Sequence, residues 1–360
     1  MTIPVNLGAQ SYAVDVDTQG WDSFAVGLAE RVGTAGVFVV SDDEVSRIWK
    51  ETFCLALTEQ GISPVWIDFP NGERNKTTTT WLEIVHRLSA AGIQRDSWVV
   101  AFGGGVVGDL AGFAAASILR GVRWVQVPTT LLAMVDASVG GKTAVNLPLG
   151  KNLLGAFHQP SWVYASIGAL QTLPQRELRS GLGEVLKMAA LEGGAYWSWL
   201  TQSAAALVTG HPSVVIEAIV RSVTMKSSIV SEDERDANRR LLLNAGHTLG
   251  HAIETALGHG TLTHGEAVAV GLLHECRFAV ASGVCLEPEM PDRIASVMRA
   301  FEIPMRLQGL DLDRVKSAIF LDKKAVGNKI KVPLPVSPGQ YRIEWMGEQD
   351  IDSLIRTLSL

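Results

Sequence analysis

The chain has 360 residues, more than one hydrophobic core usually serves, so we expect two domains. Its formal net charge of -6 gives no reason to expect nucleic acid or an anionic membrane as a partner. The three cysteines form no C-x-x-C motif, and neither an export signal nor an apolar membrane span is evident. We therefore expect a cytoplasmic protein.

The first part of the chain alternates between predicted strands and predicted helices. An edge strand pair is expected over residues 5–14. The next expected elements are strands at 37–40 and 65–69 and helices at 43–60 and 77–91. The alternation is expected to continue to a strand at 162–164. This rhythm is typical of a Rossmann-like α/β domain, in which helices cover a mostly parallel sheet.

A glycine-rich turn lies between a predicted strand at 98–102 and a predicted helix at 106–119. Gly103, Gly105 and Gly108 fit the pattern G-x-G-x-x-G, which is a weak signal by itself. Glycine allows close approach of the backbone, and the free N–H groups of a first helical turn attract anions. The turn is therefore a candidate site for phosphate groups.

The acidic residue that binds the ribose of a dinucleotide does not follow this turn in the usual place. The next predicted strand, 124–127, ends at Pro128, whereas Asp42 lies just after the earlier strand at 37–40. A dinucleotide-binding interpretation therefore requires a sheet in which the glycine turn comes late in the order.

A P-loop nucleotidase is a poor match. Gly141-Lys142-Thr143 resembles the end of a Walker A motif, which needs a glycine five positions before Gly141. Asp136 occupies that position.

Near residue 170, helical periodicity replaces the alternation. The expected helices are 178–191, 214–230, 241–257, 266–281, 290–301 and 312–321, and a small β pair is expected at 329–334 and 341–345. We therefore predict an α/β domain over residues 1–170 and a mainly helical domain over residues 171–360.

The helical half contains pairs of polar residues at helical spacing. Glu184 and Lys187 are three residues apart and share one helix face, which is also the spacing of an ordinary surface ion pair. His247 and His251 are one turn apart. A zinc protease would have glutamate after the first histidine, where Thr248 stands, so that class is excluded. Two such histidines could equally be core residues.

His264 is expected to open a helix, where its alternative role is that of a loop or cap residue. Glu184, His247 and His264 together offer one carboxylate and two imidazoles, the composition of an open catalytic zinc site. The cations beside apolar segments are Lys226, Arg240, Lys323 and Lys324. They suit a substrate that carries carboxylate or phosphate, and their alternative is a solvated surface.

Several long runs, in their order along the chain, resemble the 3-dehydroquinate synthase family of sugar-phosphate cyclases. The runs are FGGGVVGDLAGFAAA, VPTTLLAMVDASVGGKTAVN, GKNLLGAFHQP, SGLGEVLK, RLLLNAGHTLGHAIE, HGEAVAVG and LDKK. The resemblance extends from about Asp42 to Lys324, which is most of the chain.

The resemblance implies that the N-terminal domain binds NAD and that the helical domain holds a metal and much of the substrate site. Glu184, His247 and His264 would hold zinc or cobalt. The residues implied for NAD are Asp42, Glu73, Lys76, Gly104, Gly105, Val106, Asp109, Thr129, Thr130, Lys142, Lys151 and Thr172. Those implied for substrate are Asp136, Lys142, Asn152, Lys187, Lys226, Arg240, Asn244, His251 and a lysine of the pair Lys323-Lys324. Arg120 matches a residue that reaches the neighbouring subunit's site, which implies a homodimer.

The resemblance also implies a reaction. The family converts 3-deoxy-D-arabino-heptulosonate 7-phosphate into 3-dehydroquinate and phosphate, a step in aromatic amino acid biosynthesis. Transient oxidation by NAD acidifies a neighbouring C–H, phosphate leaves by β-elimination, and the same cofactor reduces the ketone. Ring opening and an intramolecular aldol step then give the carbocycle.

Two positions depart from the family pattern, Ser166 where aspartate is usual and Ala169 where a larger residue is common. Both concern the cofactor side of the site. One alternative is a sister cyclase acting on a sugar phosphate without a carboxylate, against which Arg240, Asn244 and the late lysine pair argue. The others are a metal-dependent polyol dehydrogenase, which would release NADH, and a non-catalytic NAD- or metal-binding regulator.

Overall fold

The computed structural model describes residues 1–258, 260–321 and 329–359. The chain divides into two compact units, Met1–Leu173 and Pro174–Leu360. Each has its own core. Among the described residues, no helix is both long enough and apolar enough to cross a membrane.

The first unit is built on a seven-stranded sheet in the order β1-β2-β9-β6-β5-β3-β4. Only the edge pair β1–β2 is antiparallel, and the other neighbours run parallel. The strands are β1 (Thr2–Val5), β2 (Tyr12–Asp17), β3 (Val37–Asp42), β4 (Val65–Phe69), β5 (Trp98–Gly103), β6 (Arg123–Pro128) and β9 (Trp162–Ser166). This is the Rossmann-like mostly parallel sheet that the sequence predicts.

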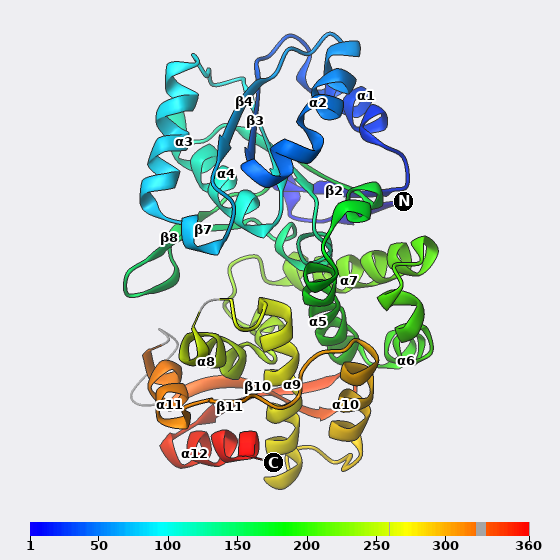
Figure 1. The fold of residues 1–360 in the computed structure, drawn as a ribbon, viewed down its shortest axis with the longest axis vertical. Helices are drawn as coiled ribbons and strands as arrows, with labels where there is room; N and C mark the ends of the chain where they lie inside the picture. The colour runs from blue at the N-terminus through cyan, green and yellow to red at the C-terminus, as the bar shows by residue number, and fades with distance from the viewer. Residues whose placement is uncertain (259, 322–328, 360) are drawn as a thin grey trace. The chain divides into compact units, whose positions relative to one another are not determined.

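Helices cover both faces of this sheet (Figure 1). One face carries α1 (Trp21–Val32) and α2 (Asp43–Glu59), and an aromatic cluster fills the space below them. In that cluster the rings of Phe53 and Phe102 stack at 4.1 Å. The other face carries α3 (Thr78–Ala90) and α4 (Gly105–Ser117). Because both faces are covered, β3, β5 and β9 are buried at every residue, as expected for parallel strands.

The expected strand–helix alternation is wrong between residues 142 and 157. This segment forms an antiparallel hairpin of β7 (Lys142–Leu147) and β8 (Gly150–Phe157), which makes a separate small sheet. It follows two glycines with positive φ, Gly140 and Gly141, and turns within a few residues. So short a connection leaves no room for a crossover helix.

The second unit is mainly helical and is organised around α9 (His264–Ala281), which is buried along most of its length. The other helices are α5 (Gln175–Glu192), α6 (Gly194–Val208), α7 (Pro212–Glu232), α8 (His247–Leu257), α10 (Met290–Ala300), α11 (Leu312–Leu321) and α12 (Glu348–Arg356). The late β pair is confirmed as β10 (Ile330–Ser337) and β11 (Gln340–Met346).

One predicted helix of the second unit is broken. The sequence predicts a continuous helix over 241–257, but the chain forms a 3-10 segment, Arg239–Asn244, and only then begins α8. The break falls at Gly246, which has φ +77° and lies in the left-handed region. The break makes His247 the first residue of α8.

Candidate active site

Glycine contacts bring α5 and α9 into direct backbone contact. A Cβ on Gly183 would lie 2.0 Å from the carbonyl oxygen of Gly265, and one on Gly265 would lie 1.7 Å from that of Ser180. No side chain fits at either position. Glu184, the residue after Gly183, is thereby held beside His264, which opens α9.

A second set of glycines packs α8 against α9. A Cβ on Gly271 would lie 2.0 Å from the carbonyl oxygen of Gly246, and one on Gly250 would lie 2.9 Å from that of Ala267. The buried Glu275 of α9 accepts hydrogen bonds from the backbone N–H groups of Gly246, at 2.6 Å, and Leu249, at 3.4 Å. It therefore satisfies free donors at the start of α8 and fixes where that helix begins.

The result is a convergence of the three residues that the resemblance implies for metal. Oε1 of Glu184 lies 3.6 Å from Nε2 of His247 and 3.4 Å from Nε2 of His264. His251 adds a third imidazole, and the ligand atoms of the three histidines lie within 4.8 Å of one another. Helices α5, α8 and α9 each contribute to this cluster.

The chemistry of the donor set fits a divalent transition metal. A carboxylate and imidazole nitrogens are the ligands that catalytic zinc uses, with one position left for water or substrate. The Glu184 carboxylate is completely buried, and an anion in that position needs cations around it. Nζ of Lys187 supplies one, 2.5 Å from Oε2. The Glu184–Lys187 pair is therefore not a surface ion pair.

Glu254 lies behind the metal ligands and was not singled out from the sequence. Its Oε2 is 3.4 Å from Nδ1 of His264, so His264 is flanked by Glu254 on one ring nitrogen and Glu184 on the other. Burial lowers the pKa of His264, but the two carboxylates outweigh burial and raise it to about 9. A carboxylate behind a histidine is the usual arrangement that orients a metal ligand.

We expect Glu254→Ala to weaken zinc binding by about 10- to 100-fold, the usual cost of removing a partner behind a ligand. The zinc affinity of Glu254→Gln should lie between those of the unmutated protein and Glu254→Ala, because the glutamine amide oxygen can still accept a hydrogen bond from Nδ1 of His264. Zinc affinity is measured by competition with a chelating dye. Thr255→Ala, the exposed neighbour on α8, is the matched control. Unchanged affinity in Glu254→Ala would contradict this role.

Three cations that the sequence analysis names in the second unit are buried, so the alternative of a solvated surface is wrong for them. Lys187 is 1% exposed, Lys226 of α7 is 7% exposed and Arg240 is 2% exposed. Lys323 and Lys324 lie outside the described residues. Charged groups this deep in a protein are paired or serve a ligand.

The segment before α8 is shaped around Arg240. The Asp233 carboxylate accepts hydrogen bonds from the backbone N–H groups of Ala237, Asn238 and Arg240 at 3.0, 2.7 and 3.1 Å. Burial raises the pKa of Asp233, but these donors outweigh it and lower the pKa overall. Nη1 of Arg240 donates to the carbonyl oxygen of Glu234 at 2.5 Å. Asn244 ends the same 3-10 segment.

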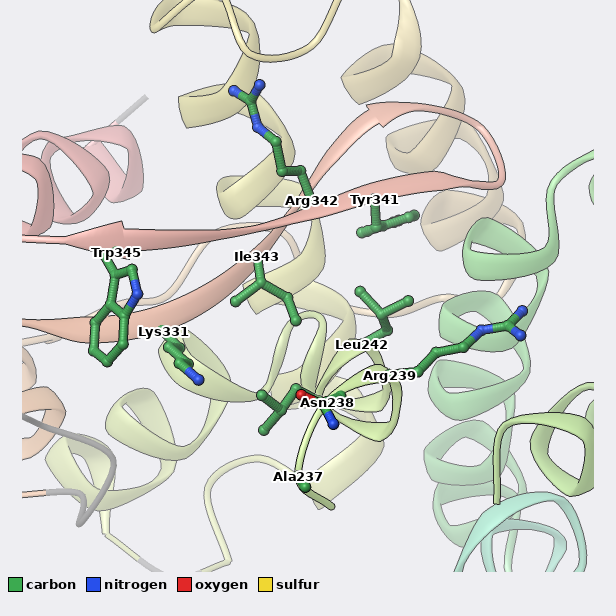
Figure 2. Close-up of a pocket in the computed structure, with 10 residues that line it drawn as sticks. Ala237, Asn238, Arg239, Leu242, Lys331, Tyr341, Arg342, Ile343 and Trp345 are labelled. Carbon is green, nitrogen blue, oxygen red and sulfur yellow. The ribbon is translucent and has the colours of Figure 1, made fainter. Parts of the chain in front are cut away.

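A hollow of about 500 Å³ lies between this segment and the β10–β11 hairpin. It was not predicted from the sequence. Figure 2 shows the guanidinium groups of Arg239 and Arg342 pointing away from the other lining residues. Each is ion-paired, with Glu232 and Glu344 respectively. These two arginines therefore do not supply the hollow with a cation, and Nζ of Lys331, the other lining cation, lies over the ring of Trp345 at 5.1 Å.

In the first unit, the glycine turn follows β5 and leads into α4. No side chain among the described residues caps α4, whose N-cap is Gly104, and its first turn contains no acidic residue. The N–H groups of Gly105 and Val106 therefore stand at an uncapped helix N-terminus, which suits a pyrophosphate. A Cβ on Gly104 would lie 3.1 Å from the Thr130 side chain, which would have to shift by a few tenths of an ångström to admit it.

Asp42 ends β3, which pairs with β5, so the sheet brings it to the same edge as the glycine turn. Burial raises the pKa of its carboxyl group against the opposing effect of hydrogen bonds. One of those bonds comes from the N–H of Val45, at 2.8 Å, so Asp42 also caps α2. The acid and the uncapped turn together fit a dinucleotide.

The other residues implied for this unit lie on several elements. Lys76 forms an ion pair with Asp109 of α4 and donates to Asn152 at 2.6 Å. Glu73 accepts from Asn146 at 2.8 Å. The remaining positions are Thr129 and Thr130 after β6, Asp136 in the π-helical turn Ala133–Ala137, Lys142 at the start of β7, Lys151 in β8 and Thr172 at the end of the 3-10 segment Ile167–Thr172.

The two departures from the family pattern are both buried. Ser166 donates from Oγ to the carbonyl oxygen of Gln19 at 2.7 Å, a bond that an ionised aspartate cannot make. Ala169 is 1% exposed, and its carbonyl oxygen accepts from Thr172. Serine therefore suits its local surroundings in this chain.

Comparisons with known proteins identify the family of this chain. Models of the N-terminal and C-terminal parts of 3-dehydroquinate synthase match residues 66–180 and 181–325. A curated 3-dehydroquinate synthase from Pelobacter propionicus is 42% identical over 323 residues, 90% of each chain. A solved 2-deoxy-scyllo-inosose synthase, complexed with carbaglucose-6-phosphate, NAD+ and Co2+, has a TM-score of 0.90 at 25% identity over 99% of each chain. A 2-epi-5-epi-valiolone synthase from Streptomyces hygroscopicus with NAD+ and Zn2+ bound has a TM-score of 0.89 at 28% identity, over 97% of this chain and 96% of that one. The chain belongs to the 3-dehydroquinate synthase family.

Proposed function

We propose that the protein converts 3-deoxy-D-arabino-heptulosonate 7-phosphate into 3-dehydroquinate and inorganic phosphate, with NAD and zinc or cobalt as cofactors. The observation that carries this proposal is the cluster of Glu184, His247 and His264 beside the buried cation of Lys187. The 42% identity to a curated synthase supports it. The step belongs to the shikimate pathway and would take place in the cytoplasm.

We assign the roles that the resemblance implies. In the first unit, the α4 turn and Asp42 hold NAD. In the second unit, Glu184, His247 and His264 hold the metal, while Lys187, Lys226, Arg240, Asn244 and His251 bind substrate. When bound, NAD accepts and returns a hydride, and the divalent ion polarises the oxygens of the substrate.

The protein's own contribution is to bind anions in a site of low dielectric. Lys187 and Arg240 are nearly inaccessible to water, so their attraction to carboxylate and phosphate is screened far less than at a surface. Their positions are fixed before substrate arrives, Arg240 by the bonds of its segment and Lys187 by Glu184. Such preorganisation and orientation supply much of the rate in reactions of this kind.

The nearest alternative is a sister cyclase for a sugar phosphate that lacks the carboxylate. Two solved synthases of other cyclitols share the fold at 25% and 28% identity, well below the identity to the curated 3-dehydroquinate synthase. The buried Arg240 and the neighbouring Asn244 favour a substrate with a second anionic group.

We also propose that the protein is a homodimer in which Arg120 reaches the neighbouring subunit's site. Leu119 and Arg120 both have positive φ, 51° and 67°, which is unusual for residues other than glycine. Both side chains are exposed at the end of α4. A monomeric mass in sedimentation experiments would contradict the dimer.

The function is tested by supplying the heptulosonate phosphate and following inorganic phosphate and NADH together. We expect phosphate to be released over many turnovers without net NADH, because the cofactor returns to its starting state. Stoichiometric NADH would indicate a dehydrogenase instead. A parallel assay with sedoheptulose 7-phosphate separates the sister cyclases, which should prefer that substrate.

A further inference from the structure

Asn146 joins the β7–β8 hairpin to the segment that precedes α3. Its backbone N–H donates to the carbonyl oxygen of Lys76 at 2.9 Å, and it forms a parallel bridge with Thr77. Its side chain donates from Nδ2 to Oε1 of Glu73 at 2.8 Å. The hairpin register shifts at this residue, between Val145 and Leu147.

The other end of the same amide holds Asn152. Oδ1 of Asn146 accepts the backbone N–H of Asn152 at 2.9 Å. Asn152 has φ +55°, a left-handed conformation that asparagine tolerates better than most residues but that still costs free energy, which the surrounding contacts must offset. The bond from Asn146 is a local constraint that helps to impose it. Since the donor and the acceptor of the amide have different partners, its orientation is fixed.

Lys76 closes the network. Its Nζ donates to Oδ1 of Asn152 at 2.6 Å and forms an ion pair with Asp109. Burial lowers the pKa of Lys76, but Asp109 and Glu73 outweigh burial and raise it, so Lys76 stays charged. Lys76 occupies one of the two lone pairs of Oδ1, so the amide nitrogen is the donor that Asn152 offers to a ligand.

We infer that Asn146 is a positioning residue that links the NAD-binding residue Glu73 to the substrate-binding residue Asn152. This inference rests on the proposed function, which supplies the roles of Glu73 and Asn152. Each bond of the Asn146 amide serves one ligand: Nδ2 orients Glu73 for NAD, and Oδ1 holds Asn152 in the conformation that presents its amide nitrogen to substrate.

Two variants separate the two bonds. Asn146→Ala removes both, so we expect KM for the heptulosonate phosphate and Kd for NAD each to rise by about tenfold, as for loss of one hydrogen bond that involves a charged or strained partner. Asn146→Asp keeps the acceptor for Asn152 but places a negative charge against Glu73. It should raise Kd for NAD and leave KM for substrate within about twofold of the unmutated enzyme.

A double-mutant cycle tests whether Asn146 acts on substrate through Asn152. In an Asn152→Ala background, Asn146→Ala should cause no further rise in KM for substrate, whereas its effect on NAD should persist. Leu149→Ala, at the 90% exposed tip of the same hairpin, is the control and should change neither constant. Multiplicative effects on KM, or equal effects of Asn146→Asp and Asn146→Ala on substrate, would overturn the inference.

Binding of NAD is followed by quenching of protein fluorescence, which needs no turnover. If the unmutated enzyme released no phosphate, the proposed function would fail, while the NAD measurements on Asn146→Asp and Asn146→Ala would still decide the link to Glu73. If Kd for NAD in both variants stayed within twofold of that of the unmutated enzyme, the proposed link between Asn146 and Glu73 would be wrong. Thermal unfolding of each variant shows whether a loss reflects unfolding.

Discussion

Glu184→Gln should lose most of its bound zinc, the largest effect that we expect from a single substitution. Removing a partner behind a ligand costs about 10- to 100-fold in affinity, and Glu184 is itself the carboxylate of the proposed ligand set. Glutamine keeps the shape of the side chain but neither its charge nor its strength as a ligand. Metal content after dialysis and a chelator competition give the loss, and zinc retained at full occupancy would refute the assignment.

This substitution also strips Lys187 of its counter-charge. A buried cation left without its partner destabilises a protein by about 3–5 kcal/mol, so the variant could lose metal merely by unfolding. The double variant Glu184→Gln/Lys187→Met removes the stranded charge. We expect it to regain stability in thermal unfolding and still to lack zinc. Glu192→Gln, the same change at an exposed position of α5, is the control.

Because His251 lies in the same cluster, we expect Glu184→Gln to keep a weak affinity for zinc. Three imidazoles lie close enough to share an ion, so a weak site of three histidines can remain when the carboxylate is lost. The double variant Glu184→Gln/His251→Ala should lose this residual zinc affinity. If His251→Ala released the metal while Glu184→Gln retained it, the ligand set would instead be the three histidines.

The metal cluster could be predicted from the sequence as a composition but not as a geometry. Helical spacing places His247 and His251 on one face, and the family motifs supply Glu184 and His264. The approach of the helices depends on contacts such as Gly183 with Gly265, which are far apart in the chain. Glu254 was within reach of the same reasoning, because it lies seven residues after His247 and three after His251, on the same face of α8.

Three helices of the structure, α1, α6 and α12, were not predicted from the sequence. Local signals for α1 and α12 were present but overlooked, because both have acidic residues in the first turn and an arginine in the last. Helix α6 lacks these signals: it follows Gly193, begins at Gly194, and has no acidic residue in its first turn. There, tertiary packing supplies what local propensity does not.

The clearest limit of prediction from the sequence is the different burial of neighbouring residues of the same type. Arg239 and Arg240 are chemically equal in the sequence, yet one side chain is 51% exposed and paired with Glu232, and the other residue is 2% exposed. The difference arises from the turn that Asp233 organises. The residue pattern of this segment does not by itself predict such a turn.

This contrast provides the second large prediction. Arg240→Ala should lower kcat/KM for the heptulosonate phosphate by at least about 30-fold, because truncating one member of a buried charge pair costs about 2–5 kcal/mol. Kd for NAD should stay within about twofold, since the residues assigned to NAD lie in the first unit. Arg240→Lys keeps the charge but loses the planar fork, so it should recover only part of the loss.

Arg239→Ala is the matched control for this experiment. It removes the same side chain one residue earlier, from a position whose guanidinium points away from the neighbouring hollow and pairs with Glu232 (Figure 2). Exposed ion pairs contribute at most about 1 kcal/mol, so kcat/KM should change by no more than about fivefold. If Arg240→Ala weakened NAD and substrate equally, or if both alanine variants lost activity alike, Arg240 would be a structural residue of its turn, because an anion-binding side chain affects only the ligand that it contacts.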